Sequence, residues 1–182
     1  MRTRALVVIA VAALALVGCG KHNLVLKVDV LSYLDASQRT FEVATVPAVG
    51  VEGEIPILDM PINLIEGLDK AAEVRSVTLS LAGGVSVEGG SGDGHFKLYL
   101  SEVGTTSSTP VMDVPVTFSA GSPAVIDVTT AGSAEVARLF AQKSLQLTVV
   151  LDHVHITSTV TNMRVAITKF DAIVISGRKN SF

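Results

Sequence analysis

The chain has 182 residues, of which 48% are hydrophobic and 17% are charged, and its formal net charge is −3 at pH 7. This mild acidity argues against nucleic acid and against electrostatic adhesion to anionic lipid. Exposed aromatic platforms for sugar rings are scarce, because there are two Tyr, six Phe and no Trp, so carbohydrate binding is disfavoured. A single cysteine, Cys19, excludes a disulfide within one chain.

The first nineteen residues have the pattern of an export signal. Arg2 and Arg4 precede an apolar run, residues 5–17, which is too short to span a membrane. The run ends in Leu-Val-Gly-Cys at residues 16–19, and these four residues resemble the lipobox of bacterial lipoproteins. The resemblance implies cleavage after Gly18 and lipidation of Cys19.

The same resemblance implies a location in the cell envelope. In that family, Asp after the cysteine favours retention at the inner membrane, and here Gly20 occupies that position. The expected location is therefore the outer membrane, with the periplasmic face favoured and the cell surface left open. Without residues 1–18 the chain has 12 basic and 17 acidic residues, a formal charge of −5. Acyl chains, not charge, would hold it on the membrane.

The remaining chain is long enough for one domain with one core. We expect the signal peptide at residues 1–18, followed by the lipidated cysteine and a short tether at 19–23. A single β domain should cover 24–176 and a C-terminal tail 177–182.

Strands are predicted wherever apolar and polar residues alternate. The segments with this pattern are 24–30, 77–81, 96–101, 112–118, 125–129, 145–156 and 163–175. About eight short strands separated by turn residues predict an all-β fold, either a β-sandwich or a barrel-like form of it.

One short helix is predicted after residue 133. Ser133 can cap its N-terminus, Glu135 lies in the first turn and Lys143 lies near the C-terminus, each matching the helix dipole. We expect about three turns that cover an end or a face of the sheets. The apolar stripe of this helix consists of Val136, Leu139 and Phe140.

Residues 46–68 are apolar but broken by Pro47, Pro56 and Pro61. Such a segment either packs on the core as a crossover or stays available to a partner. Packing is favoured, because exposed contiguous apolar patches are uncommon in soluble proteins. If the segment is a partner surface, its residues are Ile55, Ile57, Leu58, Met60 and Ile62.

The glycine-rich segment 89–94 has neither the spacing of the nonapeptide calcium repeat nor the Lys and Ser or Thr of a phosphate loop. It is therefore predicted to be a flexible hairpin loop.

His153 and His155 are the only residues whose spacing suggests a chemical function. Two histidines at i and i+2 of a strand point to one side, about 7 Å apart, and can share a metal if a third ligand such as His95 joins them. Leu151 has the same parity, so the histidines would face the core unless a bulge near Asp152 switches the faces. We predict this bulge, and favour ordinary exposed histidines over a metal site.

No catalytic signature is present, and a Gly-x-Ser-x-Gly elbow is absent from the sequence. We therefore predict no cofactor and a lipid-anchored, non-catalytic β-sandwich lipoprotein. It would act through contacts with another envelope protein, in envelope assembly or as an accessory subunit. The alternative is a metal-dependent binding protein or enzyme that uses His153 and His155.

Overall fold

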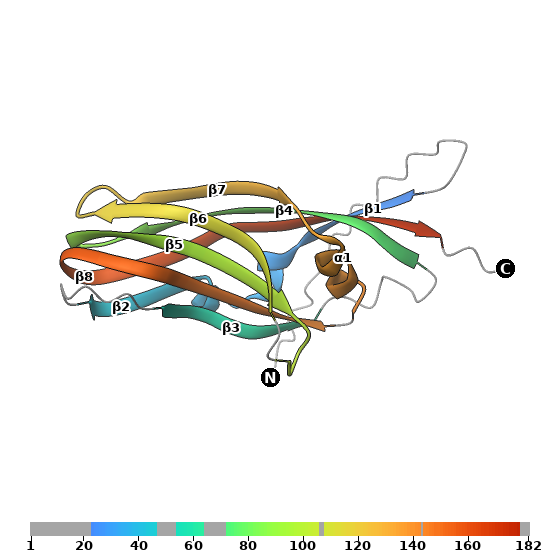
Figure 1. The fold of residues 1–182 in the computed structure, drawn as a ribbon, viewed down its shortest axis with the longest axis horizontal. Coiled ribbons are helices and arrows are strands. Elements are labelled where there is room, and N and C mark those ends of the chain that lie inside the picture. Colours follow the sequence, from blue (N-terminus) through green and yellow to red (C-terminus); the bar gives the residue numbers. More distant parts are fainter. Residues whose placement is uncertain (1–22, 47–53, 64–71, 106–107, 143, 179–182) are drawn as a thin grey trace, which may run out of the picture.

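The computed structural model describes residues 23–46, 54–63, 72–105, 108–142 and 144–178. Strands dominate it, and a single α-helix is described (Figure 1), which confirms the predicted all-β class. The elements in chain order are β1 (Asn23–Asp29), η1 (Val30–Tyr33), η2 (Ala36–Gln38), β2 (Thr40–Val46), β3 (Ile55–Asn63), β4 (Ala72–Ser86), β5 (Gly89–Ser101), β6 (Thr109–Ser119), β7 (Ala124–Ala131), α1 (Ala134–Phe140) and β8 (Ser144–Arg178). Within these ranges, no helix is long and apolar enough to cross a membrane.

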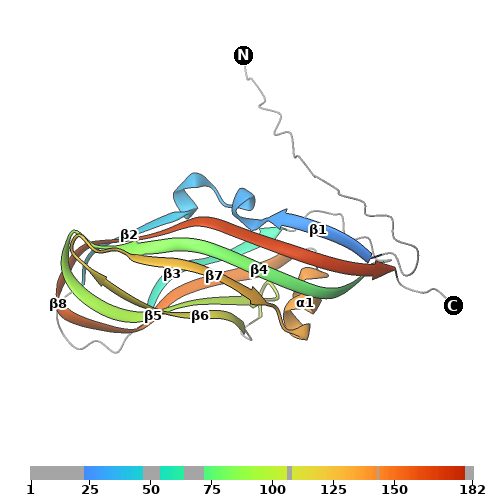
Figure 2. The same ribbon diagram turned by 90° about the horizontal axis from the view of Figure 1, so that it is seen from above.

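The long strand β8 joins two layers of antiparallel strands. Its first half lies between β5 and β3, and β6 pairs with the other side of β5. We call this set the β5 layer. Its second half lies between β4 and the pair β1 and β2, while β7 flanks β4; this set is the β4 layer. The layers are continuous where β8 bends (Figures 1 and 2), so the sandwich is one nearly barrel-shaped sheet.

The hydrophobic core fills the space between the two layers. Alternate residues of each strand point into it, as period-two side-chain geometry requires. Its largest fully buried side chains include Phe96, Phe118, Phe140, Phe170, Leu79, Leu81 and Leu98. Each such side chain contributes about 1.5–3 kcal/mol by leaving water.

Helix α1 lies at the end of the sandwich opposite the bend of β8 (Figure 1), where its apolar stripe is buried. The predicted N-cap is confirmed, because Ser133 Oγ accepts a hydrogen bond from the backbone N–H of Val136, at 3.3 Å. The predicted length is wrong. The helix has seven residues, about two turns, because the chain enters β8 at Ser144.

The glycine-rich segment 89–94 is not a loop, so that prediction is wrong. It forms the first half of β5 and pairs with both β6 and β8. Its glycines allow the neighbouring backbones to come close: a Cβ at Gly92 would lie 2.7 Å from the backbone oxygen of His155. The sequence signal for a turn therefore reflects tight strand packing.

Candidate functional site

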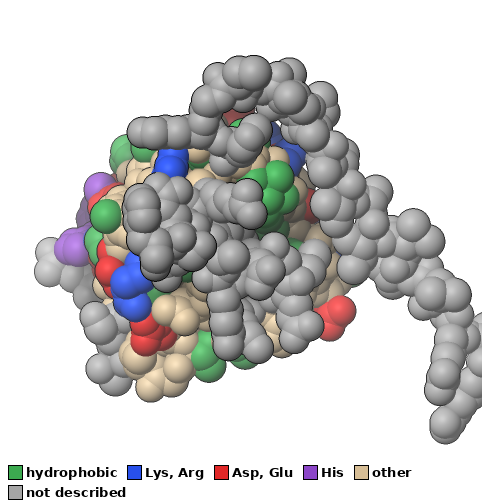
Figure 3. Space-filling view, turned by 90° about the vertical axis from the view of Figure 1, so that its right-hand side faces the viewer, with side chains coloured by type: hydrophobic (Ala, Val, Ile, Leu, Met, Phe, Trp, Pro, Cys, Tyr) green, Lys and Arg blue, Asp and Glu red, His purple; other side chains and the backbone are tan. Residues whose placement is uncertain are grey.

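Polar side chains gather on the outer face of the β5 layer. On β5, Lys97 and Tyr99 alternate with core residues, and on β8 the outward positions include Gln146 and Thr148. Figure 3 shows the histidines and neighbouring acidic and basic side chains together on one side of the molecule. This face is the best candidate for a binding surface.

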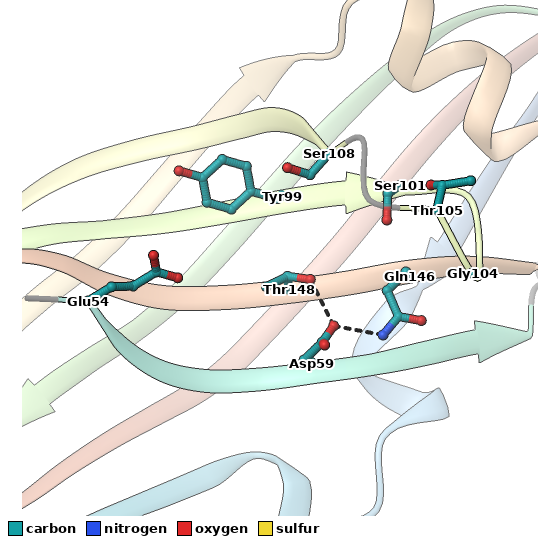
Figure 4. A pocket seen from close by; sticks show the side chains of 9 residues that line it. All are labelled: Glu54, Asp59, Tyr99, Ser101, Gly104, Thr105, Ser108, Gln146 and Thr148. Carbon is teal, nitrogen blue, oxygen red and sulfur yellow. Dashed lines mark hydrogen bonds between the residues drawn. The ribbon is translucent and has the colours of Figure 1, made fainter.

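An open hollow of about 560 Å³ lies on this face between β3, β5 and β8. Figure 4 shows the lining side chains on these strands, with Gly104, Thr105 and Ser108 beyond the end of β5. The residues that line it are Glu54, Asp59, Tyr99, Ser101, Gly104, Thr105, Ser108, Gln146 and Thr148. Among the described residues, the lining contains two carboxylates and no Lys, Arg or His, which gives this part of the hollow a negative charge.

Asp59 is held at the floor of the hollow by β8. Gln146 Nε2 and Thr148 Oγ1 both donate to Asp59 Oδ1, at 2.7 and 2.9 Å, as Figure 4 shows. Strand register explains the arrangement, because Asp59 stands opposite Thr148 in the β3–β8 pair. The carboxylate is thus fixed in place before any ligand binds.

A second polar group lies farther along β5. Lys97 Nζ donates to Asp152 Oδ2 at 2.5 Å and lies 3.9 Å from Asp113, while His95 Nδ1 lies 2.6 Å from Asp113 Oδ1. The hydrogen bond to Asp152 raises the pKa of Lys97. The same bond, followed by those from the backbone and ring of His153, lowers the pKa of Asp152.

The predicted bulge near Asp152 is confirmed. The β5–β8 register shifts between Asp93 and His95, and His153 has a φ of 50°. Leu151 and Val154 are both buried as a result, whereas the side chains of His153 and His155 are 71% and 62% exposed.

The three histidines of the metal alternative do not share one centre. The rings of His95 and His153 approach edge to face, with centroids 6.2 Å apart, but the nearest carboxylate to His155 is Asp93, at 3.4 Å. Among the described residues, no three His, Cys, Asp or Glu side chains form a group that could hold a metal ion. This part of the chain therefore lends the metal alternative no support.

The favoured prediction for this segment, packing on the core, holds for most of the residues that the alternative assigned to a partner surface on β3. Ile57, Leu58 and Ile62 are buried in the core, and Ile55 and Met60 are half-buried. A shift in the β3–β8 register between Pro56 and Leu58 places Ile57 and Leu58 inside together. The favoured prediction of packing thus holds for the apolar face of β3, although the segment forms a strand and not a crossover.

Cys19, the predicted lipidation site, lies outside the described residues, as does the predicted signal peptide at residues 1–18.

Sequence reasoning missed the hollow. Its polar residues on β5 and β8 occupy every second position, as outward-facing residues of a strand do. Only the pairing of β3 with β8, however, brings Asp59 beside them.

The Lys97–Asp152 pair predicts a pH dependence. Because the folded pKa of Asp152 lies below its usual 3.8, the stability it contributes is present above that value and is lost as the pH falls through the folded pKa. Because the pKa of Lys97 is raised above 10.5, its contribution is lost only as the pH rises through that raised value. Asp152→Asn should therefore lower the urea midpoint at pH 7, and the difference from wild type should shrink below about pH 4.

The matched control is Asp127→Asn on β7, which removes an exposed carboxylate that has no hydrogen-bond partner among the described residues. Its urea midpoint should follow the wild type at both pH values. An Asp152→Asn deficit that persists unchanged at about pH 3 would contradict the ionic origin.

Comparisons with known proteins identify no family. No protein-family model and no curated protein matches the chain. Among solved structures, it is similar to a chain in "Structure of infectious bursal disease virus Gx strain", with 12% identity and a TM-score of 0.38. The alignment covers 94% of this chain and 42% of that chain, so this chain spans less than half of its length. A likeness this distant says nothing about function.

Proposed function

We propose that this chain is a lipid-anchored, non-catalytic β-sandwich lipoprotein of the bacterial cell envelope that acts through contacts with another protein. The observation that carries the proposal is the lipobox at residues 16–19, which ends only four residues before β1 begins at Asn23. Four extended residues span about 14 Å. A lipidated Cys19 would therefore keep the sandwich against its membrane, and the favoured site is the periplasmic face of the outer membrane.

The polar outer face of the β5 layer supports a binding role. The contacts that surround its histidines are to carboxylates and to another histidine. In the described part of the chain, no histidine forms a hydrogen bond with a Ser or Thr hydroxyl, which is one of the pairings that activate a nucleophile. The hollow between β3, β5 and β8 offers a preformed recess on the same face.

Cys19→Ser should abolish incorporation of labelled palmitate, because the thiol is the acceptor that the lipobox implies. If the export signal is also replaced by a cleavable signal joined at Lys21, the protein should leave the membrane fraction and become soluble. Intact mass and membrane fractionation measure these outcomes.

Gly20→Ala is the matched control, because it changes the neighbouring residue and keeps the cysteine. It should remain labelled and membrane-bound. Palmitate labelling that survives Cys19→Ser would show that the anchor lies elsewhere.

A further inference from the structure

Exposed apolar side chains concentrate at one end of the sandwich. Of the five large hydrophobic side chains that are exposed in the described chain, three lie on β1 or near the end of β8: Leu24, Val25 and Ile173. The other two are Val103, which follows β5, and Val125 on β7. Figures 1 and 2 show β1 and the last part of β8 side by side, at the end of the sandwich opposite the bend.

The strand register places two of these side chains and Ile175 on one face. Val25 stands opposite Ile175, and Ile173 stands opposite Lys27. Residues that stand directly opposite each other share a face of the sheet. Val174, between the two isoleucines, points into the core, so Val25, Ile173 and Ile175 lie on the outer face of the β4 layer. We call these three residues the β1 patch. Val25 is 48% exposed, Ile173 is 39% exposed and Ile175 is half-buried.

Long basic side chains border the β1 patch. Lys27 Nζ lies 3.0 Å from Asp171 Oδ2. Arg75 covers Gly177, and its Nη1 donates to Asn23 Oδ1 at 2.8 Å. Such side chains can keep their charged ends in the headgroup region while their aliphatic stems stay beside apolar neighbours. An apolar surface with this border fits the interface of a bilayer, where hydrocarbon meets polar headgroups.

The length of chain between the lipobox and β1 keeps this end of the sandwich near the anchor. Val25 follows Cys19 by six positions, which span at most about 20 Å when fully extended. Val125 is much farther away: through β4 it is in register with Ala166 of β8, nine residues from Ile175, or about 30 Å along the strand. The outer face between them is polar, as in the hydrogen-bonded hydroxyls of residues 80 and 129. An anchored chain therefore brings the β1 patch to the bilayer before the exposed valine of β7.

We infer that the β1 patch lies in the interface of the bilayer that holds the anchor, with Val25, Ile173 and Ile175 in contact with lipid. The inference rests on the proposed function, because it requires a lipidated Cys19. The acyl chains hold the chain on the membrane, and the β1 patch sets its orientation. The outer face of the β5 layer belongs to the opposite side of the sandwich, so this orientation leaves its polar side chains open to a partner.

The test uses the full lipidated chain reconstituted into phosphatidylcholine vesicles. Cys19 is the sole cysteine and its thiol would carry lipid, so Val25→Cys or Ile173→Cys supplies a single site for the fluorophore bimane. The vesicles contain lipids with a nitroxide quencher at either a shallow or a deep acyl carbon. Bimane at both positions should be quenched more strongly by the shallow nitroxide, because interfacial apolar faces lie about 5–10 Å into the boundary between headgroups and acyl chains.

Val125→Cys is the matched control, because it makes the same substitution at an exposed valine of the same layer. Bimane at this position should be unaffected by either nitroxide lipid and should stay accessible to iodide in the water. Flotation shows that each labelled chain is bound to the vesicles, and circular dichroism shows that it is folded.

Two results with vesicle-bound chains would overturn the inference. If bimane at positions 25 and 173 is quenched no more than at position 125, the β1 patch does not contact lipid and is a free surface for a protein. If all three positions are quenched equally, the chain has no preferred orientation. Failure of the proposed function looks different: with Cys19 unmodified, each variant carries two dyes and does not float, which removes both the anchor and the bilayer contact.

Discussion

Ile57→Asp should unfold the sandwich or lower its free energy of unfolding by about 4 kcal/mol or more. Ile57 on β3 is 7% exposed and belongs to the main core. The change removes a buried aliphatic side chain, which alone costs about 2–5 kcal/mol, and places a carboxylate in an apolar site without a partner. Urea denaturation followed by circular dichroism measures the loss.

Val125→Asp is the matched control, since it introduces the same residue on a strand of the other layer. Val125 on β7 is 79% exposed, so the cost should stay below about 1 kcal/mol, mostly from strand propensity. Equal stability of the two variants would mean that β3 does not pack on the core. The partner surface at residues 55–62 would then become tenable again.

The strands were predictable because their pattern is local. Alternation in segments such as 96–101 and 112–118 is visible in the sequence, and burial of Phe96, Leu98 and Phe118 confirms it. The bulge at Asp152 was also predictable, because apolar residues change parity there. Prolines at positions 56 and 61 concealed β3, since an edge strand tolerates missing amide donors that an interior strand does not.

The hollow was not predictable, because its parts are far apart in the chain. Asp59 and the residues that bind it, Gln146 and Thr148, are separated by 87 and 89 positions. Isolated Asp, Gln and Thr residues on strands have no spacing that marks a site. Only the β3–β8 register, with its irregularity between Pro56 and Leu58, brings them together.

We expect Gly90→Ala, at the glycine-rich start of β5, to destabilise the region where the layers join. Gly90 has a φ of +81°, and a Cβ there would lie 2.3 Å from the backbone oxygen of Thr159 in β8. Its own carbonyl accepts a hydrogen bond from the N–H of Ala120, in the β6–β7 turn. Gly90 of β5 thus lies against the backbone of β8 and is hydrogen-bonded to the β6–β7 turn.

Gly121 provides the control, because it has a similar φ of +76° and a Cβ added there would have no atom within 4 Å. Gly121→Ala should cost about 1 kcal/mol, the strain of a left-handed alanine alone. Gly90→Ala adds a steric overlap with rigid backbone to the same strain, so its cost should reach at least about 3 kcal/mol. The difference between the urea midpoints of the two variants measures the cost of the steric overlap alone. Equal midpoints would show that β8 yields easily at Thr159, and the bend would then be a compliant hinge between the two layers.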